Sequence, residues 1–186
     1  IIKVASIPKE RIQVYFIDNE EYFKRKATFT DEDGALFPDN DERAIFFAKG
    51  VVETVKKLNW SPDIIHVHGW MASLLPVYLR EYYADEPLFA DSKIVTSVYG
   101  KSFEGSLNPE MNKKLTFDKI PEHCIERISP PTYNNLLKAA VDYSDAVILA
   151  AEELPDELKG YVEQLEKPVL SYVPLQEFEE AYTEFY

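Results

Sequence analysis

The stretch PDIIHVHGWMASLLPVYLR, residues Pro62–Arg80, decides the fold class. It begins with a short apolar run, Asp63–His68, which ends in two histidines. A longer apolar segment, Trp70–Tyr83, follows after a glycine and is interrupted by Pro76. A short apolar run bounded by turn residues is typical of a buried strand, and the longer segment is typical of a helix. The stretch therefore predicts one strand–helix unit of a parallel sheet.

The same alternation continues along the rest of the chain. Further apolar runs typical of strands occur at Lys93–Val98, Asp145–Leu149 and Pro168–Val173. Segments with helical periodicity follow them at Tyr133–Tyr143, Glu152–Leu165 and Gln176–Tyr186. Buried strands that alternate with amphipathic helices predict an α/β fold with a doubly wound, Rossmann-like, mostly parallel sheet. We expect helices on both faces of this sheet and a single domain over residues 1–186, incomplete at its N-terminus.

The residues before Pro62 are expected to add a hairpin, a loop and a helix. The apolar runs Ile1–Ile7 and Ile12–Ile17 flank a polar turn and predict a β-hairpin near the start. Glu20–Pro38 has no period and is expected to be a surface loop. Asp39 then marks a helix start, and apolar residues follow at helical spacing: Ala44, Ala48, Val51, Val55 and Leu58.

Composition excludes several classes of partner. The net charge of −13 argues against nucleic acid and against anionic membrane surfaces, both of which require clustered basic residues. No run of about 18 apolar residues indicates a transmembrane helix. The single cysteine, Cys124, excludes an internal disulfide and a cysteine metal cluster, and it favours a cytoplasmic location.

Common catalytic and cofactor motifs do not occur in the chain. Neither a dinucleotide-binding glycine pattern nor a P-loop nor a nucleophile elbow is found. Four aspartates near residue 35 lack the spacing of a calcium loop and are expected to form a solvated acidic loop: Asp31, Asp33, Asp39 and Asp41. We therefore expect no metal ion and no cofactor.

A binding site is expected where the parallel strands end, because such folds bind ligands at the carboxyl edge of the sheet. This places His68, Tyr99–Gly100, Ala150 and Ser171 near one rim. His66 and His68 are two residues apart in a strand, so they point to the same face. His66 is expected to be a hydrogen-bonded core histidine, whereas His68 is as well suited to a ligand site as to the core.

Two further groups of residues are expected to lie outside this site. His123 falls in a polar segment and is interpreted as a surface residue, and Cys124 is placed in irregular structure. Aromatic residues in the closing helix have helical spacing and are interpreted as a docking face: Phe178, Tyr182, Phe185 and Tyr186.

An ordered set of motifs resembles one known family. The chain contains, in this order, VYFIDNEEYFKRK (Val14–Lys26), the DEDG and FPDNDERAIFF motifs within Asp31–Phe47, SPDIIHVHGWMASLLPVYL (Ser61–Leu79), KIVTSVYG (Lys93–Gly100) and NLLKAAVDYSDAVIL (Asn135–Leu149). In this order they resemble the N-terminal domain of bacterial glycogen synthase and plant starch synthase. The likeness extends over about residues 11–173, but it includes neither the family's first segment nor its C-terminal domain.

The resemblance implies one half of a GT-B glycosyltransferase. Such an enzyme transfers glucose from ADP-glucose to an α-1,4-glucan with retention of configuration and without a metal. The implied partners are therefore the glucan, the sugar nucleotide, and a second GT-B domain or a synthase partner. The residues that match the family's site region are His68, Gly69, Trp70, Tyr99, Gly100 and Ser171.

This chain departs from the family pattern at three polar site positions. Gly69 replaces an aspartate that follows the histidine, Tyr99 lies where the family has a histidine–asparagine pair, and Ser171 aligns near an asparagine. Loss of one such group commonly costs on the order of 100-fold in rate. No residue is therefore assigned a catalytic role. Two main hypotheses stay open: an active glucosyltransferase half, or a catalytically silent paralogue that binds glucan or a synthase partner. A third, a Rossmann-like domain with another small ligand, ranks lowest because the motif order is so specific.

Overall fold

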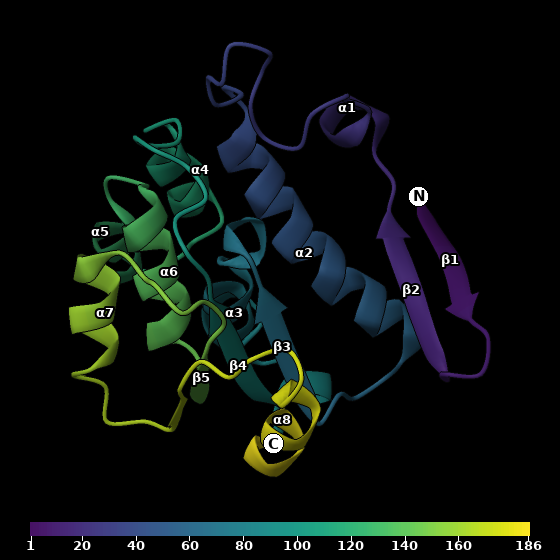
Figure 1. Cartoon of the computed structure of the whole chain (residues 1–186). Helices are drawn as coiled ribbons and strands as arrows, with labels where there is room; N and C mark the ends of the chain where they lie inside the picture. The colour runs from purple at the N-terminus through teal and green to yellow at the C-terminus, as the bar shows by residue number, and fades with distance from the viewer.

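A four-stranded parallel sheet organises the molecule (Figure 1). The computed structural model describes all residues from Ile1 to Tyr186. The strand order is β3-β4-β5-β6, with bounds Ile64–His68, Lys93–Val98, Ala146–Leu149 and Val169–Leu170. His66 pairs with Val95 and His68 with Ser97, so the two histidines share one face of the sheet, as predicted. The predicted α/β class with a mostly parallel sheet is confirmed.

The helical segments are shorter than the sequence periodicity indicates. The α-helices are α1 (Glu20–Phe23), α2 (Asn40–Leu58), α3 (Leu75–Val77), α4 (Met111–Phe117), α5 (Glu122–Ile128), α6 (Tyr133–Asp142), α7 (Asp156–Val162) and α8 (Phe178–Phe185). The segment that follows β3 is a chain of short turns, with 3-10 helix η1 (Trp70–Ala72), then α3, then π-helix η2 (Tyr78–Tyr82); 3-10 helix η3 (Pro87–Phe89) follows. No helix is both long enough and apolar enough to cross a membrane.

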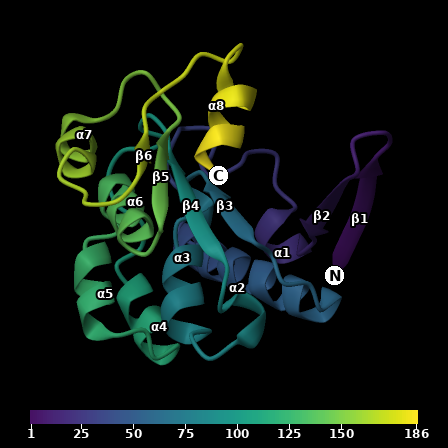
Figure 2. The ribbon, with the colours of Figure 1, turned by 90° about the horizontal axis from the view of Figure 1, so that it is seen from below.

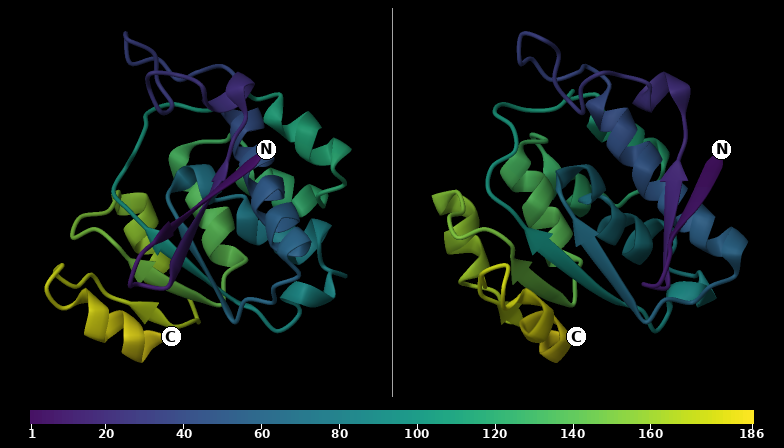
Figure 3. Two further views of the ribbon diagram at one scale, coloured as in Figure 1. Left: turned by 90° about the vertical axis from the view of Figure 1, so that its right-hand side faces the viewer. Right: turned by 45° about the vertical axis from the view of Figure 1, so that its right-hand side comes forward.

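The two faces of the sheet are covered unequally. Helices α2, α3 and α6 lie over one face, and α8 lies alone over the other (Figure 3). Side chains that point to the first face, such as Val67 and Val147, belong to the main apolar core. The predicted cover on both faces is therefore present, but the second layer is a single two-turn helix.

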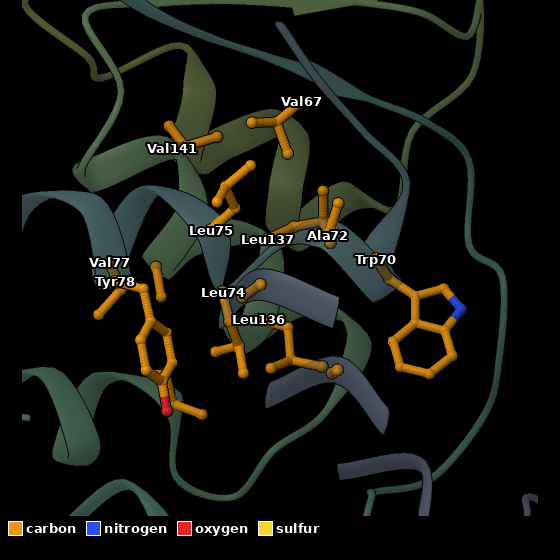
Figure 4. Close-up of a cluster of buried hydrophobic side chains, with 14 of the residues drawn as sticks. Val67, Trp70, Ala72, Leu74, Leu75, Val77, Tyr78, Leu136, Leu137 and Val141 are labelled. Atoms are coloured by element: carbon orange, nitrogen blue, oxygen red, sulfur yellow. The ribbon is translucent and has the colours of Figure 1, made fainter. Parts of the chain in front are cut away.

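The main core joins the segment after β3 to α6. Figure 4 shows Leu74, Leu75 and Val77 gathered with Leu136 and Leu137, and the exposed fraction of each is at most 5%. Burial of one such aliphatic side chain stabilises a fold by about 1.5–3 kcal/mol. These contacts hold β3 and its histidines in place against the helical layer.

Helix α2 packs its small residues inward. Ala44, Ala48 and Val52 are buried, and the helix ends at Asn59, which adopts a left-handed backbone conformation. The predicted stripe is correct for Ala44, Ala48, Val51 and Val55, which are buried or pack against the core, whereas Leu58 at the end of the helix is 43% exposed.

The predicted N-terminal hairpin is confirmed. Strand β1 (Ile2–Ile7) pairs antiparallel with β2 (Ile12–Ile17), and the hairpin stands beside α2, away from the sheet (Figure 2). Ile17 lies close against α2 at Gly50, where a Cβ atom would meet its side chain at 3.1 Å. Gly50 thus permits the close approach of hairpin and helix.

The acidic loop differs from its prediction. Asp39 binds Arg25, whose Nη1 lies 2.8 Å from Oδ1, and the fully buried Asp41 accepts from Lys114 Nζ at 2.6 Å. Asp31 and Asp33 are exposed loop residues, as predicted, and Asp31 also accepts from the backbone of its own turn. The expected solvated loop is therefore wrong for Asp39 and Asp41, because basic side chains from neighbouring segments pair with them.

Three helices occur where none was predicted: the four-residue α1, which begins the expected surface loop Glu20–Pro38, and helices α4 and α5. Helices α4 and α5 lie between β4 and α6, and α5 carries both His123 and Cys124. Cys124 is buried in the core, and His123 is exposed. Their placement in a loop and in irregular structure is therefore corrected. Helices α4 and α5 are each only seven residues long, which is too short for the apolar residues to show a clear helical period in the sequence.

Candidate functional site

The carboxyl ends of β3 and β4 bring two of the predicted residues together. His68 ends β3, and Tyr99 follows β4 directly. The Nδ1 atom of His68 lies 2.8 Å from the Tyr99 hydroxyl, a hydrogen-bond distance. His68 is exposed and Tyr99 is partly buried, so both present polar atoms at the rim where strands of this fold receive ligands.

His66 lies beneath this pair, on the same face of the sheet. Its ring centroid is 3.8 Å from that of His68, and its Nε2 is 2.7 Å from the Ser97 hydroxyl. Its Nδ1 contacts the hydroxyl of Tyr186, which comes from the end of α8. Both ring nitrogens thus have partners, in agreement with the expected hydrogen-bonded role.

Both histidines are neutral near physiological pH, because partial desolvation at the sheet surface lowers their pKa values. Desolvation, with a smaller contribution from the neighbouring His68, lowers the pKa of His66 to about 4. Desolvation also lowers the pKa of His68 below its usual value. The site therefore offers neutral imidazoles, which both donate and accept hydrogen bonds.

The lowered pKa of His66 predicts acid sensitivity. In the unfolded chain His66 takes up a proton near pH 6.5, whereas in the folded chain it does so only near pH 4. Stability is therefore lost as pH falls between these values, by about 1–2 kcal/mol after discounting for partial exposure. Urea denaturation at pH 7 and pH 5 measures this loss. His66→Asn should show a smaller loss, and an equal loss in the variant would contradict the assignment.

Gly69 has a conformational role at the rim. Its φ of 75° and ψ of 160° lie in a region that essentially only glycine occupies. A Cβ atom built there would meet nothing within 4 Å. Backbone strain, and not crowding, is therefore what would oppose a side chain at this position.

Trp70 is part of the core. It is 4% exposed, and its ring packs edge-on against Phe29 at 5.6 Å and Phe103 at 5.0 Å. This packing anchors the loop after α1 over the end of β3. Little of its surface is left for a ligand.

Gly100 and Ser171 occupy different surroundings. The carbonyl oxygens of Tyr99 and Gly100 both accept from the buried Tyr133 hydroxyl, at 2.9 and 2.8 Å, which fixes the backbone after β4. Ser171 follows β6 and lines a separate cavity of about 420 Å³ together with Leu149 and Lys167. The structure thus joins His68 to Tyr99 but gives Ser171 no contact with either.

Two partners of the site were not assigned to it from the sequence. Ser97 lies at the carboxyl end of β4 and is fully buried, and Tyr186 approaches from the end of the chain. Tyr182 also lies against His66, at 6.1 Å between ring centroids. The aromatic spacing of the closing helix predicted a docking face, and two of its residues, Tyr182 and Tyr186, contact His66 of the same chain.

The comparisons with known proteins agree with the motif order. A family model described as the starch synthase catalytic domain matches residues 1–167. The chain belongs to this family. It is 37% identical to the glycogen synthase of Chlorobium limicola over 161 residues, which is 86% of this chain and 32% of that protein. It is 32% identical to the glycogen synthase of Chlorobaculum tepidum over 181 residues, or 92% of this chain and 33% of that protein.

Family membership confirms the resemblance seen in the motifs. The chain is a glycogen synthase-type glycosyltransferase domain, and its sheet with the added hairpin is consistent with one Rossmann-like half of a GT-B enzyme. It spans about a third of the length of the curated glycogen synthases that it matches.

Proposed function

We propose that this domain forms half of a glucosyltransferase that moves glucose from ADP-glucose to the end of an α-1,4-glucan with retention of configuration. A second GT-B domain, in the same polypeptide or in a synthase partner, completes the cleft. The observation that carries the proposal is the exposed His68–Tyr99 pair at the carboxyl ends of β3 and β4. In an α/β sheet this is the edge where a ligand binds.

The chemistry of the pair suits a neutral sugar. A neutral imidazole and a phenol can each donate to and accept from sugar hydroxyls. Desolvation lowers the pKa of His68 and raises that of Tyr99, so neither group carries a charge at neutral pH. Both side chains are positioned on strand ends, which hold a bound sugar in one orientation.

A second candidate function is glucan binding without catalysis. Three observations favour it: Gly69 carries no carboxylate, the Tyr99 ring lies against His68 at 6.2 Å between centroids, and α8 covers the neighbouring His66. In this case the rim holds a glucan but lacks a group that stabilises the developing charge of a transition state.

Two measurements on the full-length protein distinguish these functions. The first is ADP release from ADP-glucose in the presence of a glycogen primer. The second is migration through a native gel that contains glycogen. ADP release supports transfer, retarded migration without ADP release supports the binding function, and unretarded migration without ADP release contradicts both.

A substitution at the rim tests the assigned residues. His68→Ala removes the imidazole that faces the ligand and is expected to lower ADP release, or glycogen affinity, by about 10- to 100-fold. The side chain is exposed, so the melting temperature should change little. Gln164→Ala, an exposed change with no side-chain hydrogen bond, is the control. Wild-type activity and affinity in His68→Ala would remove this residue from the site.

A further inference from the structure

Three side chains with metal-binding atoms converge far from the rim. Glu81 comes from η2, and His123 and Cys124 come from α5. One donor atom from each lies within 4.8 Å of the other two. The adjacent Tyr143 precedes β5, which places this Glu81–His123–Cys124 cluster near the amino ends of the strands, opposite the His68 rim.

We propose that Glu81, His123 and Cys124 bind a zinc ion. A carboxylate, an imidazole and a thiolate are all ligands of zinc, and the sulfur disfavours magnesium and calcium, which prefer oxygen alone. Three protein ligands leave the fourth position of a tetrahedral ion for water.

The distances in the cluster fit a tetrahedral ion. Zinc bonds of about 2.3 Å to sulfur and about 2.0–2.1 Å to nitrogen place the two ligand atoms about 3.5 Å apart at the tetrahedral angle. The Cys124 Sγ atom lies 3.4 Å from His123 Nε2. The carboxylate of Glu81, within 4.8 Å of both, needs to approach by no more than about 1.5 Å, which a rotation of its flexible side chain provides.

Tyr143 holds the sulfur in position. Its hydroxyl lies 2.7 Å from Cys124 Sγ and 3.1 Å from His123 Nε2. A hydrogen bond to the coordinating sulfur orients that ligand, whereas the contact with Nε2 must break when this nitrogen binds the ion. The hydroxyl is therefore a positioning group next to the proposed ion.

The burial of the cluster gives the ion one route of entry. Cys124 is 1% exposed, Glu81 is partly buried and His123 is exposed. An ion can enter from the His123 side and reach the thiol. On binding, the zinc–sulfur bond replaces the S–H bond and the proton leaves to water, with no change of oxidation state.

A bound ion would connect three parts of the helical layer. Glu81 belongs to the segment after β3, the other two ligands belong to α5, and Tyr143 ends α6. An ion that binds only the folded state stabilises it in proportion to the logarithm of its concentration over its dissociation constant. The proposed effect of the ion is therefore to stabilise the helical layer, independently of sugar binding.

Zinc titration of the purified full chain tests the proposal. We expect calorimetry with zinc chloride to give one ion per chain, and the melting temperature to rise with zinc and fall back with a chelator. Cobalt in place of zinc should produce the near-ultraviolet absorption of a cobalt–thiolate bond. Binding of less than one ion per chain, or cobalt binding without this absorption, would overturn the assignment.

Substitutions identify the ligands. His123→Gln lies on the surface and should fold normally, and we expect it to weaken zinc binding by more than about 10-fold. Glu81→Gln should have a similar effect, whereas Glu152→Gln, an exposed glutamate elsewhere, is the matched control. Cys124→Ser should abolish the cobalt–thiolate absorption. Equal zinc affinity in His123→Gln and in the control would refute the site.

Discussion

Replacement of Trp70 by alanine is expected to lower the free energy of unfolding by about 3–5 kcal/mol. The indole is 4% exposed and packs between Phe29 and Phe103. Its removal leaves a cavity bordered by two further aromatic rings, and both the lost burial and the cavity destabilise the fold. The change also releases the loop that Phe29 fixes over the end of β3.

Trp60 provides a matched control for this prediction. It is 55% exposed, so Trp60→Ala should cost less than about 1 kcal/mol. Urea denaturation followed by circular dichroism compares the two variants without relying on tryptophan fluorescence. If Trp70→Ala costs no more than Trp60→Ala, Trp70 is not a packing residue, and its place among the ligand-binding candidates would have to be restored.

The order of strands and long helices could be predicted from the sequence, because burial of one face of an element makes apolar residues recur at a regular spacing along the chain. Strand β4 matches its predicted bounds, and α6 differs by one residue at its end. For the segment after β3 the sequence predicts a helix interrupted by Pro76. In the structure it is helical from Trp70 to Tyr82 but changes from 3-10 to α to π turns, and Pro76 lies in the first turn of α3, where its missing N–H is tolerated.

Part of the site also followed from the sequence, because strand ends in a parallel sheet share one edge. That rule placed His68 and Tyr99 together, as the structure has them. Contacts between segments that are distant in the chain leave no recognisable pattern in the local sequence of either segment. The approach of Tyr186 to His66, and of Glu81 to Cys124, depends on how whole elements pack.

Gly69 shows how a structure changes the interpretation of a substitution. From the sequence it is a lost carboxylate, and this loss raises the possibility of a silent enzyme. In the structure it is also a residue whose φ of 75° and ψ of 160° exclude an ordinary side chain without strain. An aspartate with this backbone conformation would carry a strain of about 1–3 kcal/mol, so the substitution to glycine also removes a conformational cost.

The second large effect is expected at Asp118, which joins three elements. It follows α4, accepts from the Tyr78 hydroxyl of η2 at 2.6 Å, and pairs with Lys49 of α2 at 2.8 Å. Burial and this carboxylate raise the pKa of Tyr78 well above its usual value, so the phenol remains a donor. Asp118→Ala leaves a fully buried hydroxyl and a lysine without an acceptor, which should cost about 3 kcal/mol.

A double-mutant cycle separates the two partners of Asp118. Tyr78→Phe alone should cost about 1–2 kcal/mol, and combined with Asp118→Ala it should cost less than the sum, because the orphaned hydroxyl is gone. Asp85→Ala, an exposed aspartate without an ion pair, is the control and should change stability by less than about 0.5 kcal/mol. Strictly additive losses would mean that the carboxylate is not coupled to the Tyr78 hydroxyl, and its contribution would then come from the ion pair with Lys49.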